Sequence, residues 1–318
     1  MTRKLITRAA QFSLLALLLC ALCVSSPLLS TLNSSPSAPP ARPKILGISH
    51  VRIRVSDFCR AKDFYSQALG QRPYCPVDKK PEGGSVALQS GQFITLNINS
   101  LNGGSAVGQS TLLEEIGFIT DDAAGLQQYL KSQNIAVDEV SARPPGFLVH
   151  DPEGHRISFD ERSMAPSQDP PRSPLQSRII HAGFVVRDQA AMDHFYKDIL
   201  GFHIYWHGGM SDDQTDWVDM QVPDGAEWIE FMLNVPANPD RHTLGVMNHI
   251  ALGVPDIHAA QQQLIKNGWK GTEQPKIGRD GKWQLNLYDP DDTRVELMEF
   301  TPVEKPCCSE YTGPHPRQ

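Results

Sequence analysis

The stretch IIHAGFVVRD, at residues 179–188, decides the fold because the chain contains four versions of it. The other three read ISHVRIRVSD (48–57), EIGFITDD (115–122) and NHIALGVPD (248–256). Each is an apolar strand that ends at an aspartate, and aspartate is a good N-cap for a following helix. An internal repeat constrains a fold more than local propensities do. We therefore expect four copies of one β-α-β-β-β module.

Further motifs recur within the copies. The helix after the first copy carries FYSQALG (64–70), and the helix after the third carries FYKDILG (195–201), with apolar residues at helical spacing and a glycine suited to a left-handed C-cap. The second and fourth copies share an Asp-Pro turn, at residues 151–152 and 289–290. The modules therefore pair as first with second and third with fourth.

Aligning the repeats places chemically active residues at equivalent positions. In the first half these positions hold His50, Thr95, Glu115 and Ser158, and in the second half they hold His181, Glu230, His249 and Glu296. Two neutral imidazoles with one or two carboxylates suit a divalent transition metal such as Fe(II), Ni, Zn or Mn. A single histidine on a strand is usually structural, and we expect that role for His50. Recurrence at equivalent positions favours one metal site in the second half.

Strand alternation indicates that these side chains point into a common cup. His181 shares a strand face with Ile179, Gly183 and Val185, whereas Ile180 faces the other way. We expect the substrate pocket to be lined by residues on the same faces or close to them: Trp228, Met232, Trp217, Arg294 and Tyr288.

Composition removes several classes of function. The 318 residues carry a net charge of −7 and are 40% apolar, which indicates a globular protein without the basic surface that nucleic acid requires. A chain of this length usually forms about two domains. All five tryptophans lie in the second half, so the two halves are expected to differ in function.

The N-terminus has the pattern of a secretory signal. Arg3, Lys4 and Arg8 precede an uncharged stretch at residues 12–24, which is shorter than the roughly 20 residues of a membrane span. We expect export to the periplasm or the medium after cleavage, with no stable membrane span in the mature chain; an uncleaved anchor is the alternative. In an oxidising compartment Cys59 and Cys75 are able to pair, and Cys307 and Cys308 to pair with other partners; unpaired thiols are the alternative.

These repeats resemble the vicinal oxygen chelate (VOC) superfamily, which includes glyoxalase I, fosfomycin-resistance proteins, methylmalonyl-CoA epimerase and extradiol dioxygenases. The resemblance covers residues 45 to 302 and implies an α+β fold in which paired βαβββ modules form eight-stranded half-open barrels with helices outside. It predicts the following organisation: a signal peptide at 1–26, a Ser/Pro-rich tether at 27–44, an N-terminal VOC domain at 45–161 without a complete metal site, a linker at 162–178, a C-terminal VOC domain with the metal site at 179–302, and a tail at 303–318.

The resemblance implies two competing activities on a small substrate with adjacent oxygens. In the glyoxalase branch the four residues His181, Glu230, His249 and Glu296 hold the metal, and Glu296 or Glu230 moves a proton in an isomerisation or lyase reaction. In the extradiol branch His181, His249 and Glu296 hold Fe(II) for ring cleavage by dioxygen. A metal-free binding or resistance module is a third possibility.

Departures from the family patterns guide the choice between these activities. Extradiol enzymes carry an acid–base histidine and a tyrosine before the final glutamate, but residues 278–292 contain no histidine, and Tyr288 lies too close to the turn. Because Glu230 completes the set of four, the sequence favours the lyase or isomerase. The substrate and the oligomeric state are not specified by the sequence.

Overall fold

The structure is a computed structural model that describes residues 40–68, 75, 81–98, 112–139, 146–161, 175 and 178–318. The predicted signal peptide, most of the tether and nearly all of the linker lie outside these ranges. Within the ranges, no helix has the length and apolar character needed to cross a membrane.

The first half forms one sheet of seven strands among its described residues, in the order β2-β3-β1-β4-β7-β6-β5. The strands are β1 (Ile45–Arg54), β2 (Gly83–Ala87), β3 (Phe93–Asn97), β4 (Leu113–Thr120), β5 (Asp138–Glu139), β6 (Gly146–His150) and β7 (Arg156–Glu161), and the helices are α1 (Phe58–Ala68) and α2 (Ala123–Ser132). The predicted sheet has eight strands, and residues 69–74 and 76–80, between α1 and β2, lie outside the described ranges.

The second half forms a sheet of eight strands in the order β13-β14-β15-β12-β8-β11-β10-β9. The strands are β8 (Arg178–Val185), β9 (His203–Gly208), β10 (Trp217–Gln221), β11 (Trp228–Met232), β12 (His249–Val254), β13 (Lys276–Ile277), β14 (Trp283–Tyr288) and β15 (Arg294–Glu299). The helices are α3 (Gln189–Asp193), which continues into a π-helix, η1 (His194–Ile199), then α4 (Arg241–Met247) and α5 (Ile257–Lys266). The predicted α+β fold of repeated βαβββ modules is confirmed.

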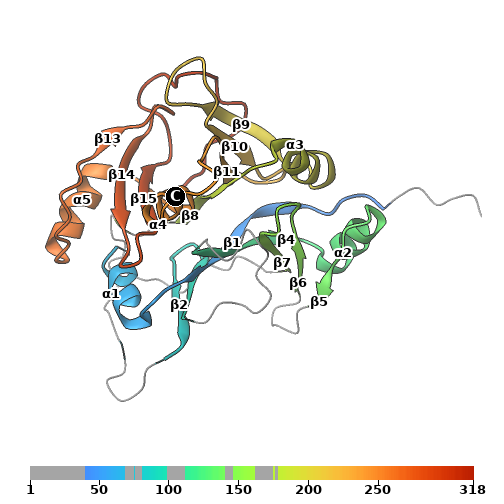
Figure 1. Ribbon diagram of the computed structural model, residues 1–318, viewed down its shortest axis with the longest axis horizontal. Coiled ribbons are helices and arrows are strands. Elements are labelled where there is room, and N and C mark those ends of the chain that lie inside the picture. The colour runs from blue at the N-terminus through green and yellow to red at the C-terminus, as the bar shows by residue number, and fades with distance from the viewer. Residues whose placement is uncertain are drawn as a thin grey trace, which may run out of the picture. The chain divides into compact units, whose positions relative to one another are not determined.

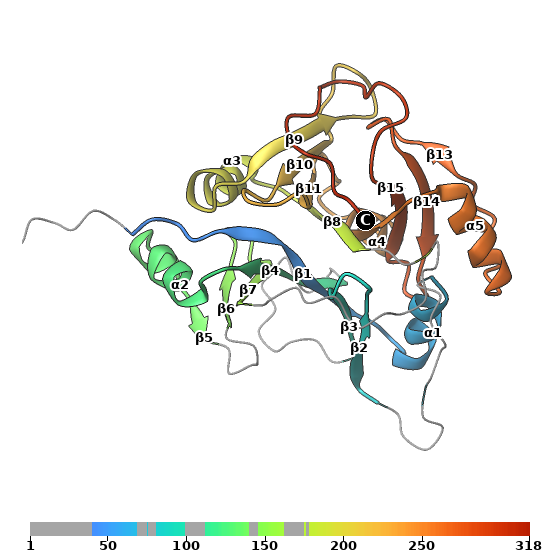
Figure 2. The ribbon, with the colours of Figure 1, turned by 180° about the vertical axis from the view of Figure 1, so that it is seen from behind.

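Helices cover the outer side of the second sheet. Helix α5 lies beside β13 and β14, and α3 lies beside β9 (Figure 1). The same arrangement is visible from behind (Figure 2). The apolar side chains facing these helices, such as Phe184, Leu252 and Leu297, are buried in the main hydrophobic core. The opposite, concave face is therefore left for the site.

The repeated aspartates cap the helices as the sequence predicts. The carboxylates of Asp122, Asp188 and Asp256 accept hydrogen bonds from backbone amides three residues later, at 2.8, 3.0 and 2.9 Å. Gly201, after η1, has φ +78°, the left-handed conformation that favours glycine. Local motifs thus set where each helix begins and ends.

Each half donates a tyrosine to an Asp-Pro turn of the other half. The Tyr65 hydroxyl donates to Asp289 Oδ2 at 3.1 Å, and the Tyr196 hydroxyl donates to Asp151 Oδ2 at 3.2 Å. All four residues are buried. The two repeated motifs, FY in the helix and DP in the turn, are therefore partners that join the two halves.

One strand-face prediction is wrong. Strands β8 and β12 shift register at the step from Ala251 to Leu252, so that Leu252 pairs with Ile179. This bulge turns Ile180 toward the concave face, where it packs with Trp228 and Ala251, while Ile179 joins the main core. Simple alternation therefore fails just before His181.

The four cysteines among the described residues are paired in two disulfides. Cys59 bonds to Cys75, as the sequence allows. Cys307 bonds to its neighbour Cys308 rather than to another partner, which corrects the sequence expectation. The residues that follow Glu299 run along the second sheet, where Thr312 N donates to Tyr205 O of β9 at 3.0 Å.

Candidate metal centre

The four predicted ligands come from four neighbouring strands of the second sheet. His181 lies on β8, Glu230 on β11, His249 on β12 and Glu296 on β15. In the strand registers, Gly183 pairs with both His249 and Glu230. A Cβ atom at Gly183 would lie 2.1 Å from His249 Cε1, so this position needs glycine for the imidazole to reach the centre.

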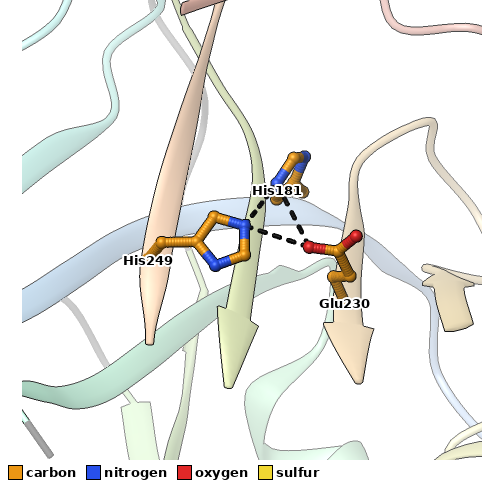
Figure 3. Close-up of side chains that lie close together, drawn as sticks. All are labelled: His181, Glu230 and His249. Atoms are coloured by element: carbon orange, nitrogen blue, oxygen red, sulfur yellow. Dashed lines mark hydrogen bonds and ion pairs between the residues drawn. The ribbon is translucent and has the colours of Figure 1, made fainter. Parts of the chain in front are cut away.

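Three of the four side chains meet on the concave face: the ligand atoms of His181, Glu230 and His249 all lie within 4.8 Å of one another. His181 Nε2 lies 3.1 Å from His249 Nε2, and His249 Nε2 lies 3.0 Å from Glu230 Oε2 (Figure 3). Glu296 Oε2 lies 3.7 Å from His181 Nε2. All four side chains are at least 85% buried, with exposed fractions of 2% and 0% for the two histidines and 14% and 4% for Glu230 and Glu296. The structure thus brings together three of the residues that the repeat alignment grouped, and it places Glu296 beside His181 but outside this group.

The imidazoles are held in the form that binds metal. Burial is the main cause that places the pKa of His181 and of His249 well below the usual value of 6.5, so both are neutral at physiological pH. His249 Nδ1 lies 3.2 Å from the carbonyl oxygen of Met247. Donation of the Nδ1 proton to this carbonyl leaves the lone pair of Nε2 directed at the centre.

A cation already contacts this lone pair. The Arg294 guanidinium donates from Nη2 to His249 Nε2 at 2.6 Å. Burial raises the pKa of Glu296 to about 7, against the opposing effect of Arg294. Two neutral imidazoles facing buried carboxylates form a donor set that suits a divalent transition metal.

A cavity of about 470 Å³ opens above the centre. Its walls include all five predicted pocket residues, Trp217, Trp228, Met232, Tyr288 and Arg294. Sequence reasoning missed other lining residues, among them Lys276, Arg279 and Asp280. These lie in β13 and the following turn, where the sequence has no periodic pattern to indicate a facing direction.

The equivalent positions of the first half form an ion-pair cluster. His50 Nε2 lies 3.3 Å from Glu115 Oε1, and His50 Nδ1 lies 3.3 Å from Asp160 Oδ2. Phe93 stacks on the imidazole at 4.7 Å between ring centres. Although burial opposes it, contact with these two carboxylates raises the pKa of His50. Both ring nitrogens of His50 thus face carboxylates.

Comparisons with known proteins agree with this fold. Residues 178–297 match the sequence model of a family described as Glyoxalase/Bleomycin resistance protein/Dioxygenase superfamily. A search of curated proteins found no match.

Among solved structures, the chain is similar to homoprotocatechuate 2,3-dioxygenase from Brevibacterium fuscum in its anaerobic complex with 3,4-dihydroxyphenylacetate, with 18% identity, TM-score 0.57, and coverage of 83% of this chain and 82% of that chain. It is also similar to the Arthrobacter globiformis homoprotocatechuate 2,3-dioxygenase, with 19% identity, TM-score 0.58 and coverage of 83% and 82%. At these identities the likeness concerns the fold. Residues 178–297 therefore match the glyoxalase/bleomycin resistance protein/dioxygenase superfamily model, and the fold is the VOC fold that the repeats of the chain predicted.

Proposed function

We propose that the protein is an Fe(II)-dependent dioxygenase of the extradiol type, which opens the ring of a small catechol. The observation that carries the proposal is the position of His181 in the cavity wall, where its Nε2 lies 3.1 Å from His249 Nε2 and 3.7 Å from Glu296 Oε2. Two histidines and one carboxylate on one face of the metal are the donor set of non-haem Fe(II) oxygenases. The four-module fold shared with homoprotocatechuate 2,3-dioxygenase adds support. This replaces the lyase or isomerase that the sequence favoured.

The residues of the cavity would each have a task in this reaction. His181, His249 and Glu296 would hold Fe(II), which when bound supplies open positions for two adjacent substrate oxygens and the redox chemistry with dioxygen. Glu230, whose carboxylate reaches the centre, would accept the proton of a catechol hydroxyl. Arg294 would donate hydrogen bonds to the ionised oxygen that results.

The cavity walls would orient the ring and limit access of water. Trp217, Trp228 and Met232 present aromatic and apolar surface on β10 and β11. Flat apolar walls suit an aromatic substrate, because ring stacking and burial both contribute to binding. The substrate is therefore proposed to be a small aromatic molecule with two adjacent hydroxyls.

A second function is favoured by one specific contact. Glu230 Oε2 lies 3.0 Å from His249 Nε2, close enough to act as a fourth metal ligand. In a glyoxalase-like enzyme all four side chains would hold the metal, and Glu296 or Glu230 would move a proton between adjacent carbons. Such an enzyme consumes no dioxygen.

One experiment separates these functions. The purified protein is loaded anaerobically with Fe(II), its metal content is measured, and oxygen uptake is followed with a panel of catechols. We expect uptake by the wild type, none by His249→Ala, and a loss of about 100-fold in Glu230→Gln with Fe(II) content retained. Loss of metal from Glu230→Gln, together with no oxygen uptake by the wild type, would favour the isomerase. A wild type that binds no metal would favour a binding module.

We further propose that the protein is exported. The support is the N-terminal signal pattern together with the two disulfides, which persist in oxidising compartments. Fractionation of the expressing cells followed by N-terminal sequencing tests this. Cleavage near residue 26 is expected, whereas an intact N-terminus in the cytoplasmic fraction would contradict it.

A further inference from the structure

Lys282 is a lysine buried inside the second half. It directly precedes β14, is 0% exposed, and its Nζ has no hydrogen-bond partner among the described residues. Burying an ammonium group without such partners is costly, so the surroundings must compensate. The cost of burying Lys282 therefore indicates that it has a specific role.

Three aromatic rings surround the ammonium group. Nζ lies 4.4 Å from the ring centre of Trp228, 5.0 Å from that of Tyr311 and 5.2 Å from that of Tyr205. These distances are within the range of cation–π attraction, which is strongest for tryptophan and grows when the cation is desolvated. We name Trp228, Tyr205 and Tyr311 the lysine cage.

Two aspartates interact electrostatically with Lys282. Burial lowers the pKa of Lys282, and the negative charges of Asp280 and Asp219 oppose this effect. Both aspartates are themselves buried. Burial raises the pKa of both aspartates, so Lys282 and these carboxyl groups form one buried polar cluster beside the cage.

Trp228 links the cage to the candidate metal centre. Its indole packs against the imidazole of His181 with 4.9 Å between ring centres and 34° between ring planes. The two residues are register partners on the parallel strands β11 and β8. The indole and the imidazole are thus in direct contact.

The two histidines differ in what orients them. His249 is fixed by the contact of its Nδ1 with Met247 O. His181 Nδ1 is buried and has no hydrogen-bond partner among the described residues. Metal-binding histidines are normally oriented by a hydrogen bond from the second ring nitrogen. For His181, packing against Trp228 takes the place of that bond.

We infer that Lys282 is a positioning residue for His181 and acts through Trp228. The ammonium group holds the indole, and the indole holds the imidazole in the orientation that binds metal. The inference rests on the proposed function only in so far as His181 binds a metal, and it does not depend on which reaction follows.

The test is a Co(II) titration of the full chain, followed by visible absorption, which reports the number and geometry of the ligands. Lys282→Met should weaken Co(II) binding about tenfold and alter the spectrum, as loss of an orienting partner does. Lys282→Arg keeps a cation in the cage and should stay within about threefold of the wild type. Lys276→Met, the control, removes a positive charge from the cavity wall without touching the cage.

The sign of the effect separates positioning from simple charge. Removing a positive charge near a bound cation should tighten binding, and Lys276→Met is expected to keep or tighten the affinity. Positioning predicts the opposite for Lys282→Met. Binding of Co(II) by Lys282→Met as tight as in the wild type, with an unchanged spectrum, would overturn the inference, and so would equal weakening in Lys282→Arg.

A second pair of variants covers the case in which Lys282→Met does not fold. Tyr311→Phe keeps the ring of the cage, whereas Tyr311→Leu removes it, so only the leucine variant should weaken Co(II) binding, by about threefold. Equal affinities in the two variants would count against the cage. Failure of the wild type to bind Co(II) would overturn the metal site itself, whereas a failure of oxygen uptake alone would leave the positioning role intact.

Discussion

The two tyrosine–aspartate contacts between the halves should contribute unequally to stability. In Tyr65→Phe the Asp289 carboxylate loses its hydroxyl donor, and in Tyr196→Phe the Asp151 carboxylate loses its donor. Both substitutions keep the ring and its packing, so the lost hydrogen bond dominates the change in the free energy of unfolding. The contacts occupy equivalent positions of the repeat, so each variant is the control of the other.

The expected losses of stability follow from the hydrogen-bond partners that each aspartate keeps. Asp289 Oδ1 accepts from backbone amides, but Oδ2 has Tyr65 as its only hydrogen-bond donor among the described residues. Asp151 Oδ2 keeps a second contact, with His155 Nδ1 at 2.8 Å. Leaving a buried charged group unsatisfied costs about 2–3 kcal/mol, whereas losing one of two hydrogen bonds costs about 1 kcal/mol. Tyr65→Phe should therefore be the more destabilising variant.

The difference in destabilisation between the two variants should depend on pH. Burial is the main cause that raises the pKa of Asp289 to about 6 from its usual 3.8. The pKa of Asp289 is higher in the folded state than in the unfolded state. Protonation of this carboxyl therefore stabilises the fold fully below pH 3.8, and this stabilisation is lost as the pH rises through about 6. At pH 4 the carboxyl is neutral in the folded state, and the cost of Tyr65→Phe should fall to about 1 kcal/mol.

Urea unfolding of the wild type and both variants, followed by circular dichroism at pH 7 and pH 4, measures these values. Equal destabilisation by the two variants at pH 7 would refute the reasoning from the remaining partners. A cost for Tyr65→Phe that is the same at both pH values would refute the assigned charge of Asp289.

Three further predictions concern the candidate metal centre of the second half and the ion-pair cluster of the first half. Gly183→Ala should displace the imidazole of His249 and weaken Co(II) binding at least tenfold; unchanged affinity in a titration would contradict the close approach. Arg294→Leu removes a cation that donates to His249 Nε2, so the same titration should show tighter Co(II) binding, and weaker binding would show that the guanidinium does not compete with the metal. In the first half, burial acts to raise the pKa of Glu115, but His50, Arg52 and Ser158 together outweigh it and lower the value from 4.5 to about 2. The carboxylate therefore contributes about 3 kcal/mol above pH 4.5 that is lost as the pH falls through about 2, and Glu115→Gln should lower the urea midpoint at pH 7 more than at pH 2.5.

The fold was predictable because each module repeats its own local signals. The strand that ends in an aspartate, the FY helix motif and the Asp-Pro turn each have a physical role, as N-cap, core and inter-half contact. The repeat alignment also grouped His181 with His249, since residues at equivalent strand positions point to equivalent places in a sheet.

Other features depend on contacts that no periodicity encodes. The bulge that places Ile180 in the cup comes from the register between β8 and β12. The disulfide between Cys307 and Cys308 depends on the path of the C-terminal residues. The burial of Lys282 requires rings from three separate segments, so a lysine before a strand is indistinguishable in the sequence from a solvated one.

The central claim is that the protein is a dioxygenase. It is tested most directly by following the oxygen atoms of dioxygen into the product. The Fe(II)-loaded protein is incubated with a catechol under ¹⁸O₂, and the product is analysed by mass spectrometry, with His249→Ala as the inactive control. Our account predicts a ring-opened product that carries both atoms of one dioxygen molecule, formed by the wild type only. A product that is an isomer of its substrate and contains no ¹⁸O, or turnover that continues without dioxygen, would contradict it.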